Sequence, residues 1–374
     1  MSRSQLKSSL HEILERPIKL PPFASRLVRL LRDRRVRIAF GAALPLALFV
    51  WLRHIRHWQP LPLQVSRGGS FVAAFSPDGK TVASTEFLKK TVYLYDYESK
   101  RVVQILSGVG GGGALAFSHD GSTLAGVSHD SRVFLSNVQT GEVKTSVTSA
   151  IPEVWSLAFS PDGLLLAVGG LTRRAGKVGT HALEVWNVPR HGLVTRLQAR
   201  LNDVRAVTFS PDGKLLAASG PVEKITSSGL SRDEAVAEVW DLQARKLKWA
   251  LHSSGGINSI AFSLDGQVLA VADGIAKICD DRTGKILHEL SCGGSIHSVA
   301  FSRQGDTLVT FTDNGDAPGC LWDTRNWTLL RKLQHGGQLF WPDDSTFAVA
   351  APTIDANADR VMVDRVTVQL YPAK

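Results

Sequence analysis

One stretch of the chain has a glycine spacing that could hold a nucleotide. Residues 108–113 read Gly-Val-Gly-Gly-Gly-Gly, which satisfies the G-x-G-x-x-G pattern of dinucleotide-binding loops, and Asp130 follows about 20 residues later. Such a loop needs a helix after it, because the helix N-terminus holds the pyrophosphate. The next residues read Ala-Leu-Ala-Phe-Ser-His-Asp-Gly, which is typical of a strand and a hairpin turn. The pattern therefore predicts a flexible turn and argues against a dinucleotide-dependent oxidoreductase.

No other pattern in the sequence predicts catalysis or a bound metal. The chain has no H-E-x-x-H, no G-x-S-x-G and no phosphate-binding loop with its lysine, and its 11 histidines are scattered. Cys279, Cys292 and Cys320 lack the C-x-x-C spacing of zinc and redox sites. We expect buried free thiols there, and because three is an odd number a disulfide would leave at least one thiol over. We predict no catalytic residue, no metal and no cofactor.

A repeated turn organises the larger part of the chain. Copies of Phe-Ser-Pro-Asp-Gly, some degenerate, begin at Phe75, Phe117, Phe159, Phe209, Phe262, Phe301 and Phe340. Proline presets φ, aspartate caps its own backbone and glycine supplies a positive φ, so each copy is typical of a hairpin turn. Apolar runs flank every copy, as in Ser-Leu-Ala-Phe before Phe159 and Leu-Leu-Leu-Ala-Val-Gly-Gly after it. Each turn is therefore expected to join two strands.

A second landmark comes after each turn and predicts a third and a fourth strand. It reads Val-Tyr-Leu-Tyr-Asp, Val-Phe-Leu-Ser-Asn, Leu-Glu-Val-Trp-Asn, Ala-Glu-Val-Trp-Asp, Ala-Lys-Ile-Cys-Asp, Gly-Cys-Leu-Trp-Asp and Val-Gln-Leu-Tyr-Pro along the chain. A short turn then leads to another strand, as in Thr-Gly-Glu-Val-Lys-Thr-Ser and Thr-Gly-Lys-Ile-Leu-His-Glu-Leu. Four strands per unit, repeated at 39 to 53 residues, predict an all-β repeat fold.

These units resemble the repeats of the WD40 β-propeller family. The resemblance covers residues 61–374 and implies seven blades around a central channel, a fold that usually binds protein partners. Only Trp186, Trp240 and Trp322 keep the family's tryptophan, and its Gly-His before the first strand is absent. We therefore expect the family's hydrogen-bond network to be broken and apolar contacts to carry more of the packing. The Gly-rich run falls where the family has Gly-His.

The strand count predicts how the ring closes. The chain ends three residues past Tyr371, in the third strand of unit seven, so this unit lacks its fourth strand. A spare strand-like stretch, Leu-Pro-Leu-Gln-Val-Ser at residues 61–66, precedes unit one. We expect it to complete the last blade, because ring closure removes exposed sheet edges.

Three units carry insertions between their second and third strands, at residues 171–182, 221–237 and 352–361. In the family these connections lie on the face that usually binds partners. We therefore treat their charged residues as candidate partner-binding residues, with tolerated surface insertions as the alternative. The candidates are Arg173, Arg174, Lys177, His181, Lys224, Arg232, Asp355, Asp359 and Arg360.

The N-terminal segment predicts a membrane anchor. Residues 38–52 are 15 uncharged and almost wholly apolar residues, and flanking arginines can snorkel to extend their reach. Residues 1–37 form a basic tail with helical periodicity that could lie on anionic lipid or only fix topology, and residues 53–60 are a linker. A cleaved signal peptide and a buried soluble helix are the alternatives for the apolar stretch.

The charge distribution predicts the orientation of this anchor. Six arginines lie in residues 22–37 and three in residues 53–68, so the positive-inside rule keeps the N-terminus cytoplasmic and places the propeller outside the cytoplasm. Residues 1–60 hold 12 Lys+Arg and 3 Asp+Glu, whereas residues 61–374 hold 31 of each. The large domain is thus neutral overall, and we expect no nucleic-acid partner.

Together these patterns predict a single-pass membrane protein whose propeller is a non-catalytic scaffold for protein partners. Two alternatives stay open: a small-ligand receptor or enzyme at the channel mouth, and an envelope assembly or sensing factor. Because a fold does not fix a function, the choice among them depends on the site.

Overall fold

The computed structural model describes the strands of the repeat region and the turns between them. Its described part is residues 61–372 without 64–70, 87–88, 129, 173–181, 202, 227–228, 303, 313–318, 334–337, 341–345 and 355–362. The predicted tail at 1–37, the predicted membrane segment at 38–52 and the linker at 53–60 lie outside it. No helix in the described part is long and apolar enough to cross a bilayer.

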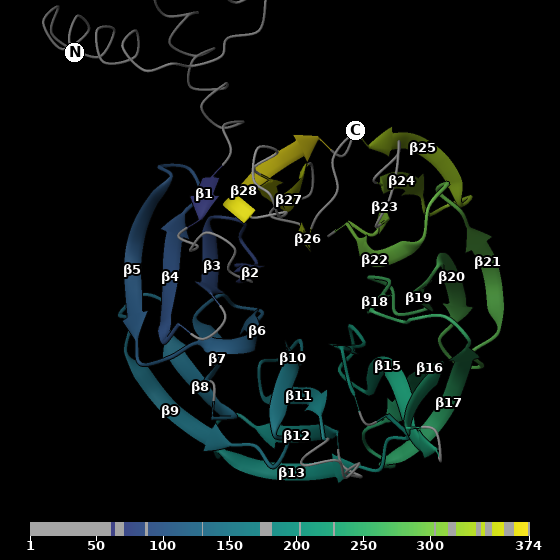
Figure 1. Cartoon of the computed structure of the whole chain (residues 1–374), viewed down its shortest axis with the longest axis horizontal. Coiled ribbons are helices and arrows are strands. Elements are labelled where there is room, and N and C mark those ends of the chain that lie inside the picture. Colours follow the sequence, from purple (N-terminus) through teal and green to yellow (C-terminus); the bar gives the residue numbers. More distant parts are fainter. Residues whose placement is uncertain are drawn as a thin grey trace, which may run out of the picture. The chain divides into compact units, whose positions relative to one another are not determined.

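Six antiparallel sheets are each built from four consecutive strands, called a to d here, and Figure 1 shows strand d at the outer edge of each sheet. Blade one contains β2 (Phe71–Phe75), β3 (Thr81–Glu86), β4 (Thr91–Asp96) and β5 (Arg101–Ser107). Blade two contains β6 (Gly111–Phe117), β7 (Thr123–Ser128), β8 (Arg132–Asn137) and β9 (Val143–Thr148). Blade three contains β10 (Glu153–Phe159), β11 (Leu165–Leu171), β12 (Leu183–Asn187) and β13 (Gly192–Leu197).

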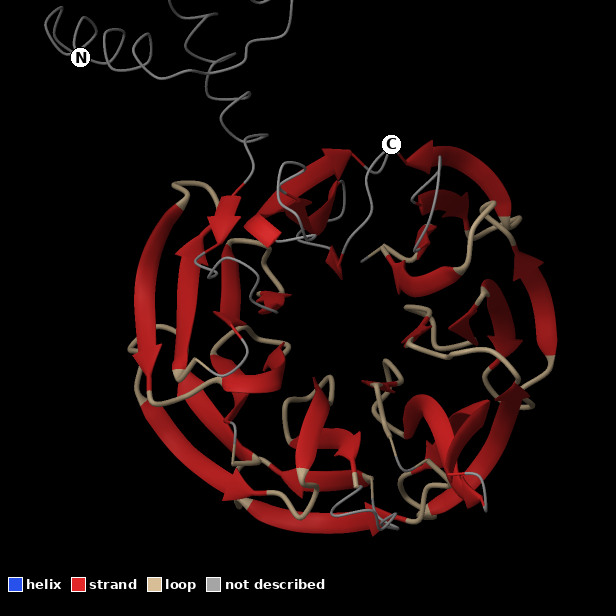
Figure 2. Cartoon of the chain, in the orientation of Figure 1, coloured by secondary structure: helices blue, strands red, loops and turns tan. Residues whose placement is uncertain are grey.

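The next three sheets have the same strand order. Blade four contains β14 (Ala206–Phe209), β15 (Leu215–Thr226), β16 (Gly229–Asp241) and β17 (Lys246–Ser253). Blade five contains β18 (Ser259–Phe262), β19 (Val268–Asp273), β20 (Ile275–Asp280) and β21 (Ile286–Leu290). Blade six contains β22 (Ile296–Phe301), β23 (Thr307–Thr312), β24 (Gly319–Asp323) and β25 (Thr328–Leu333). Figure 2 shows strands and connecting loops throughout this region, so the all-β prediction is confirmed.

A further sheet joins the two ends of the repeat region. It contains β26 (Gln338–Phe340), β27 (Thr346–Ile354), β28 (Val363–Pro372) and the early strand β1 (Leu61–Leu63). β1 pairs with β28 in antiparallel register, with Leu61 opposite Val368. All these strands belong to one compact unit, Pro60–Lys374.

The core lies between neighbouring sheets rather than within one of them. One cluster joins Val185 and Leu197 of blade three to Val207 and Leu216 of blade four, and equivalent clusters join the other neighbouring pairs from blade one to blade six. Strand b contributes small residues to these clusters, such as the fully buried Ala167. Small residues at this position let two sheets approach closely, so the repeated apolar runs become the walls between blades.

The repeated a–b turn is held by its serine and aspartate. In blade two the Ser118 hydroxyl donates to Asp120 Oδ1 at 2.5 Å, and the Ser122 backbone N–H donates to the same oxygen at 3.0 Å. Gly121 has a φ of +72°, which a side chain would strain. Blade six reads Phe-Ser-Arg-Gln-Gly-Asp, and there the hydroxyl of Ser302 donates to the aspartate after the glycine.

These turn carboxylates make the fold sensitive to acid. Hydrogen bonds from the Ser118 hydroxyl and from Ser122 lower the pKa of Asp120 to about 2, and serine hydroxyls likewise lower the pKa of Asp162 and Asp212. A folded-state pKa below the unfolded value adds stability at neutral pH, which is lost as the pH falls from about 4 toward 2. We expect the urea midpoint to fall steeply across that window.

Asp120→Asn tests this acid sensitivity. At neutral pH we expect it to cost about 1 kcal/mol, because one hydrogen-bond acceptor of the turn is replaced by a donor. Below about pH 3 the cost should shrink, because the wild-type carboxylate is then itself partly protonated. Glu142→Gln on the exposed c–d turn of the same blade is the control. Equal costs for Asp120→Asn at both pH values would contradict the assignment.

In all six blades strand d has a bulge opposite the landmark residue of strand c. The c–d register shifts at Tyr95, Ser136, Trp186, Trp240, Cys279 and Trp322. A bulge re-aims a side chain and increases the local twist. The landmark position is therefore recognisable by its backbone even where tryptophan is replaced.

Candidate interaction face

The connections between strands b and c and between strands d and a meet at one end of each blade. In blade three Glu153, at the start of strand a, pairs with Leu171, at the end of strand b. We call this end of the blades the connection face. The predicted insertions all begin at this end, because the first residue of each lies in the final part of a strand b.

The described residues include the backbone of only two of the nine candidate binding residues. Lys224 lies in β15 and Arg232 in β16. The other seven, in segments 173–181 and 355–362, lie outside the described residues: Arg173, Arg174, Lys177, His181, Asp355, Asp359 and Arg360. These nine positions remain predictions.

The second insertion is a long hairpin: most of its residues belong to strands b and c, and not to a connection between them as the sequence predicted. β15 and β16 pair from Leu215 and Asp241 out to Thr226 and Gly229. The inserted residues extend the ladder because the hairpin satisfies backbone groups that an irregular loop would leave to water. The third insertion also begins as strand, since β27 runs to Ile354. Each hairpin lengthens its blade at the end where strands b and c are connected.

The Gly-rich run is only partly the flexible turn that the sequence predicted. Gly108 and Gly110 have φ values of +79° and +98°, which suit a turn. Gly111 to Gly113 instead open strand β6, in which Gly111 and Gly112 are buried. A Cβ on Gly113 would lie 2.5 Å from Trp155 Cε3. This close approach requires glycine. The residues that follow the run form a strand and not the helix that a phosphate-binding loop needs.

A buried carboxylate ties the connection before blade three to its strand c. Glu184 is fully buried and accepts hydrogen bonds from the Ser149 hydroxyl at 2.9 Å and the Ala150 backbone N–H at 3.3 Å. Trp186 Nε1 and Arg196 Nε also donate to it, each at 3.0 Å. Four donors from three segments therefore converge on one side chain, which fixes the d–a connection against the blade.

Blade four repeats this arrangement with fewer donors. Glu238 is fully buried and accepts the Arg200 backbone N–H at 3.0 Å and Trp240 Nε1 at 3.2 Å. Burial raises the pKa of Glu238, although both hydrogen bonds act in the opposite direction. The two hydrogen bonds therefore do not fully offset the free-energy cost of burying the ionised carboxylate of Glu238.

Blade five makes the same link with an ion pair. Asp273, at the end of strand b, accepts from the hydroxyl of Ser253, which precedes the d–a connection. Lys277 of strand c donates to its other carboxylate oxygen. Glu184, Glu238 and Lys277 all stand two residues before the landmark of their strand c.

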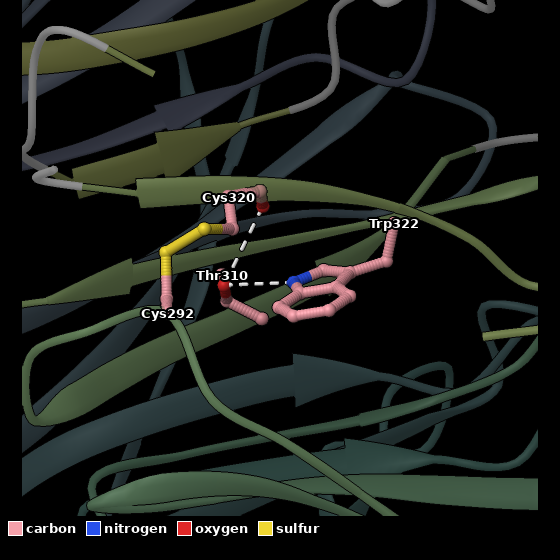
Figure 3. Close-up of a disulfide and its surroundings, with 4 residues drawn as sticks. All are labelled: Cys292, Thr310, Cys320 and Trp322. Carbon is pink, nitrogen blue, oxygen red and sulfur yellow. Dashed lines mark hydrogen bonds between the residues drawn. A yellow bond between two sulfur atoms is a disulfide. The ribbon is translucent and has the colours of Figure 1, made fainter. Parts of the chain in front are cut away.

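Blade six uses a disulfide at that position. Cys292, in the d–a connection, is bonded to Cys320, two residues before Trp322 (Figure 3). Trp322 Nε1 donates to the Thr310 hydroxyl at 3.1 Å beside it. Cys279 is free and buried, and burial raises its pKa to about 11. The expectation of free thiols was therefore wrong for two of the three cysteines, which the fold brings together from 28 residues apart.

These links correct the expectation that apolar contacts alone make up for the missing Gly-His network. Without Gly-His, the chain connects each of four d–a connections to the next blade through an acidic, ionic or disulfide link at one repeated position. Buried polar groups need such partners, because an unpaired one costs free energy. The sequence shows these residues as Glu, Glu, Lys and Cys at the same position of four successive repeats. They are hard to recognise as one feature because each copy makes its link with different chemistry.

A second repeated position places exposed or half-buried side chains on the connection face. It lies four residues before the phenylalanine of the a–b turn and is occupied by Trp155, Arg205, Asn258 and His297 in blades three to six. We call it the rim position. Trp155, Arg205 and Asn258 are exposed and His297 is half-buried. Arg205 Nη1 donates to Asn258 Oδ1 at 2.7 Å, so rim positions of adjacent blades lie side by side.

A cleft of about 200 Å³ opens between blades two and three beside this position. Its lining residues are Gly112, Gly113, Val127, Ser128, Ser131, Pro152, Glu153, Val154 and Trp155. We call it the Trp155 cleft. Among the residues that the structure describes, no group of three or more His, Cys, Asp or Glu is placed to hold a metal.

Comparisons with known proteins agree with the repeat. The family model "WD domain, G-beta repeat" matches residues 143–174 and 192–221, and the model "Anaphase-promoting complex subunit 4 WD40 domain" matches residues 230–304. A chain in the crystal structure of a mitotic checkpoint complex superposes with a TM-score of 0.62 at 17% identity, covering 80% of this chain and 86% of that chain. At this identity the likeness concerns the fold. No curated protein sequence matches the chain.

Proposed function

From the premise that this chain is a WD40-repeat β-propeller, we propose that it is a membrane-tethered, non-catalytic scaffold that binds protein partners on its connection face. WD40 propellers are typically interaction scaffolds. The partner is a protein whose surface meets the rim position and the insertions.

One observation carries this proposal: the rim position holds a different exposed or half-exposed side chain in each of blades three to six. The repeat gives all four the same backbone environment, so the backbone there requires no particular side chain, although Arg205 also pairs with the buried Asp203 at 3.4 Å. Tryptophan and arginine are among the residues most enriched at the positions that dominate protein interfaces. Aligned on rigid, linked strands, they form a preorganised recognition surface.

The insertions add chemistry to the same face. The first offers Arg173, Arg174, Lys177 and His181 without an acidic residue, which favours an acidic region of a partner. The second adds Lys224 and Arg232 on a long hairpin, and the third adds Asp355, Asp359 and Arg360. A partner that contacts several insertions gains specificity from their differing charge.

Capture of partners by variants of the full chain tests this function. We expect Trp155→Ala with Arg205→Ala to weaken capture of the main partner at least about tenfold, because interface tryptophans and arginines commonly cost about 2 kcal/mol or more when truncated. Trimming residues 173–181 should also reduce capture. Arg101→Ala at the outer edge of blade one is the matched control. If the same partners bind the rim variant, the trimmed chain and the control equally, the proposal fails.

The membrane anchor at 38–52 and the extracytoplasmic location belong to the same proposal. Their support is the apolar stretch, the excess of arginines before it and the Cys292–Cys320 disulfide, since disulfides persist mainly in oxidising compartments. Protease added to intact cells should cleave the propeller. Full protection of the propeller until the membrane is opened would contradict this orientation.

A further inference from the structure

We propose that the Trp155 cleft binds an arginine side chain of the protein partner. This inference rests on the proposed scaffold function and names the chemistry that one part of the connection face recognises. The cleft lies between blades two and three, so a partner segment that crosses the face can insert one side chain there.

The glycines of β6 line one side of the cleft with backbone alone. A Cβ on Gly113 would lie 2.5 Å from the Trp155 ring, and a Cβ on Gly112 would lie 2.7 Å from Val127 Cβ. No side chain from this stretch of β6 therefore enters the cleft. The Trp155 ring packs on this bare backbone, and Trp155, which is 37% exposed, lines the cleft beside it.

The polar side chains of the cleft are arranged to accept hydrogen bonds. The Ser131 hydroxyl donates to the Pro152 carbonyl, and the Ser128 hydroxyl donates to Asp130. Since each hydroxyl has one proton, both serines offer only lone pairs to a ligand. Glu153 adds an exposed carboxylate at the rim of the cleft. A ligand that carries several donors suits this set.

The charge of the cleft favours a cation. Glu153 is the one ionisable residue among the described lining residues. Asp130 lies next to the cleft but is paired with Arg132 at 2.6 Å, so this pair is neutral. The remaining local charge is that of the Glu153 carboxylate. A cation over the face of an indole is further attracted by the ring.

Arginine fits these features better than lysine does. Its planar guanidinium stacks on an aromatic face while its donors spread in the ring plane toward acceptors at the edge. The cleft places an indole, a carboxylate and serine oxygens around one small volume of about 200 Å³. The ammonium of lysine would be attracted by the Glu153 carboxylate, but it has no flat surface to stack on the Trp155 ring.

Nuclear magnetic resonance of the full chain with labelled tryptophan tests the proposal. The indole signal of Trp155, identified among nine tryptophans by its loss in Trp155→Phe, reports on the cleft. The probes are N-acetyl-arginine methylamide, N-acetyl-lysine methylamide and N-acetyl-norleucine methylamide. We expect the arginine probe to shift this signal at millimolar concentration, the lysine probe to bind about threefold more weakly and the neutral probe to leave the signal unchanged.

Variants separate recognition from a general surface effect. Glu153→Gln keeps the size of the side chain but removes its charge, and we expect it to weaken the arginine probe about fivefold. Glu289→Gln, an exposed glutamate on β21, should leave binding unchanged. Gly113→Ala should displace the Trp155 ring and also weaken the probe.

The proposal is overturned if the norleucine probe shifts the Trp155 signal as strongly as the arginine probe does, or if Glu153→Gln binds the arginine probe like the wild type. These readouts need no partner protein. If the rim variant loses the partner but the arginine probe does not bind the wild type, arginine binding by the cleft is refuted and the scaffold function is not. Arginine binding with unchanged partner capture refutes the proposed function and leaves the cleft in place.

Discussion

Replacing Glu184 with alanine is expected to lower the free energy of unfolding by about 3–5 kcal/mol, because it leaves several buried donors without an acceptor, at about 1–3 kcal/mol each. Its carboxylate is fully buried and accepts four hydrogen bonds. Without it, the Ser149 hydroxyl and the Trp186 indole lose their acceptor inside the protein. Arg196, whose side chain is 42% exposed, can turn to water instead. Urea unfolding of wild type and variant measures the difference.

Glu238→Ala is the matched comparison, because it removes the same side chain from the same position of the next blade. Glu238 accepts two donors, so we expect a smaller cost of about 2 kcal/mol. Its raised pKa gives a second readout. A folded-state pKa above the unfolded value means that the wild type loses stability as the pH rises from about 4.5 through the folded value, and the variant should lack this loss. If Glu238→Ala costs more than Glu184→Ala, the donor count does not determine the effect.

The repeat was predictable because each copy satisfies local backbone requirements with the same residues. The Ser-x-Asp-Gly turn needs a hydroxyl, a carboxylate and a positive φ at fixed offsets, and the structure has these features in blades one to five. The pairing of Leu61–Leu63 with β28 connects the last sheet to the early strand that the strand count singled out. Such features depend on spacing along the chain, which the sequence displays directly.

The links between blades were not predictable in the same way, because each depends on the residues that the fold brings together. Ser149 and Glu184 lie 35 residues apart, and Cys292 and Cys320 lie 28 apart. One geometric requirement, to hold a d–a connection against strand c, is met by a carboxylate, a lysine–aspartate pair or a disulfide. No single residue type occupies the position in all four blades. The absence of the family's Gly-His therefore suggests that the link is missing, although the structure makes it with other residues.

The glycine run shows a related limit. Its letters fit a phosphate loop, a turn and a strand equally well, and only the neighbours decide between them. Trp155 of the next blade occupies the space that a side chain on Gly113 would need. The sequence correctly excluded the nucleotide-binding helix, but it placed all six residues in a turn. The cleft that the last two glycines line is formed by two blades together.

Removing the disulfide is expected to be the second large perturbation of stability. The bridge closes a loop of 28 residues between a d–a connection and strand c, and the chain-entropy account assigns such a loop about 3–4 kcal/mol. We expect Cys292→Ala with Cys320→Ala to lower the free energy of unfolding by that amount. Reductant should destabilise the wild type by a similar amount and leave the double variant unchanged. Cys279→Ala, which removes the free buried thiol, should retain the response to reductant.

The same measurement bears on the compartment, because the bridge must form before it can stabilise. Protein purified without reductant from its native source should contain one reactive thiol after unfolding and three after reduction. Three thiols before reduction would mean that the cysteines meet in a reducing compartment, and the blade-six connection would then lack its covalent link. The d–a connection before blade six also leads directly into strand a, where His297 holds the rim position. Loss of the bridge should therefore loosen one side of the proposed interaction face, and partner capture by the double variant should fall together with its stability.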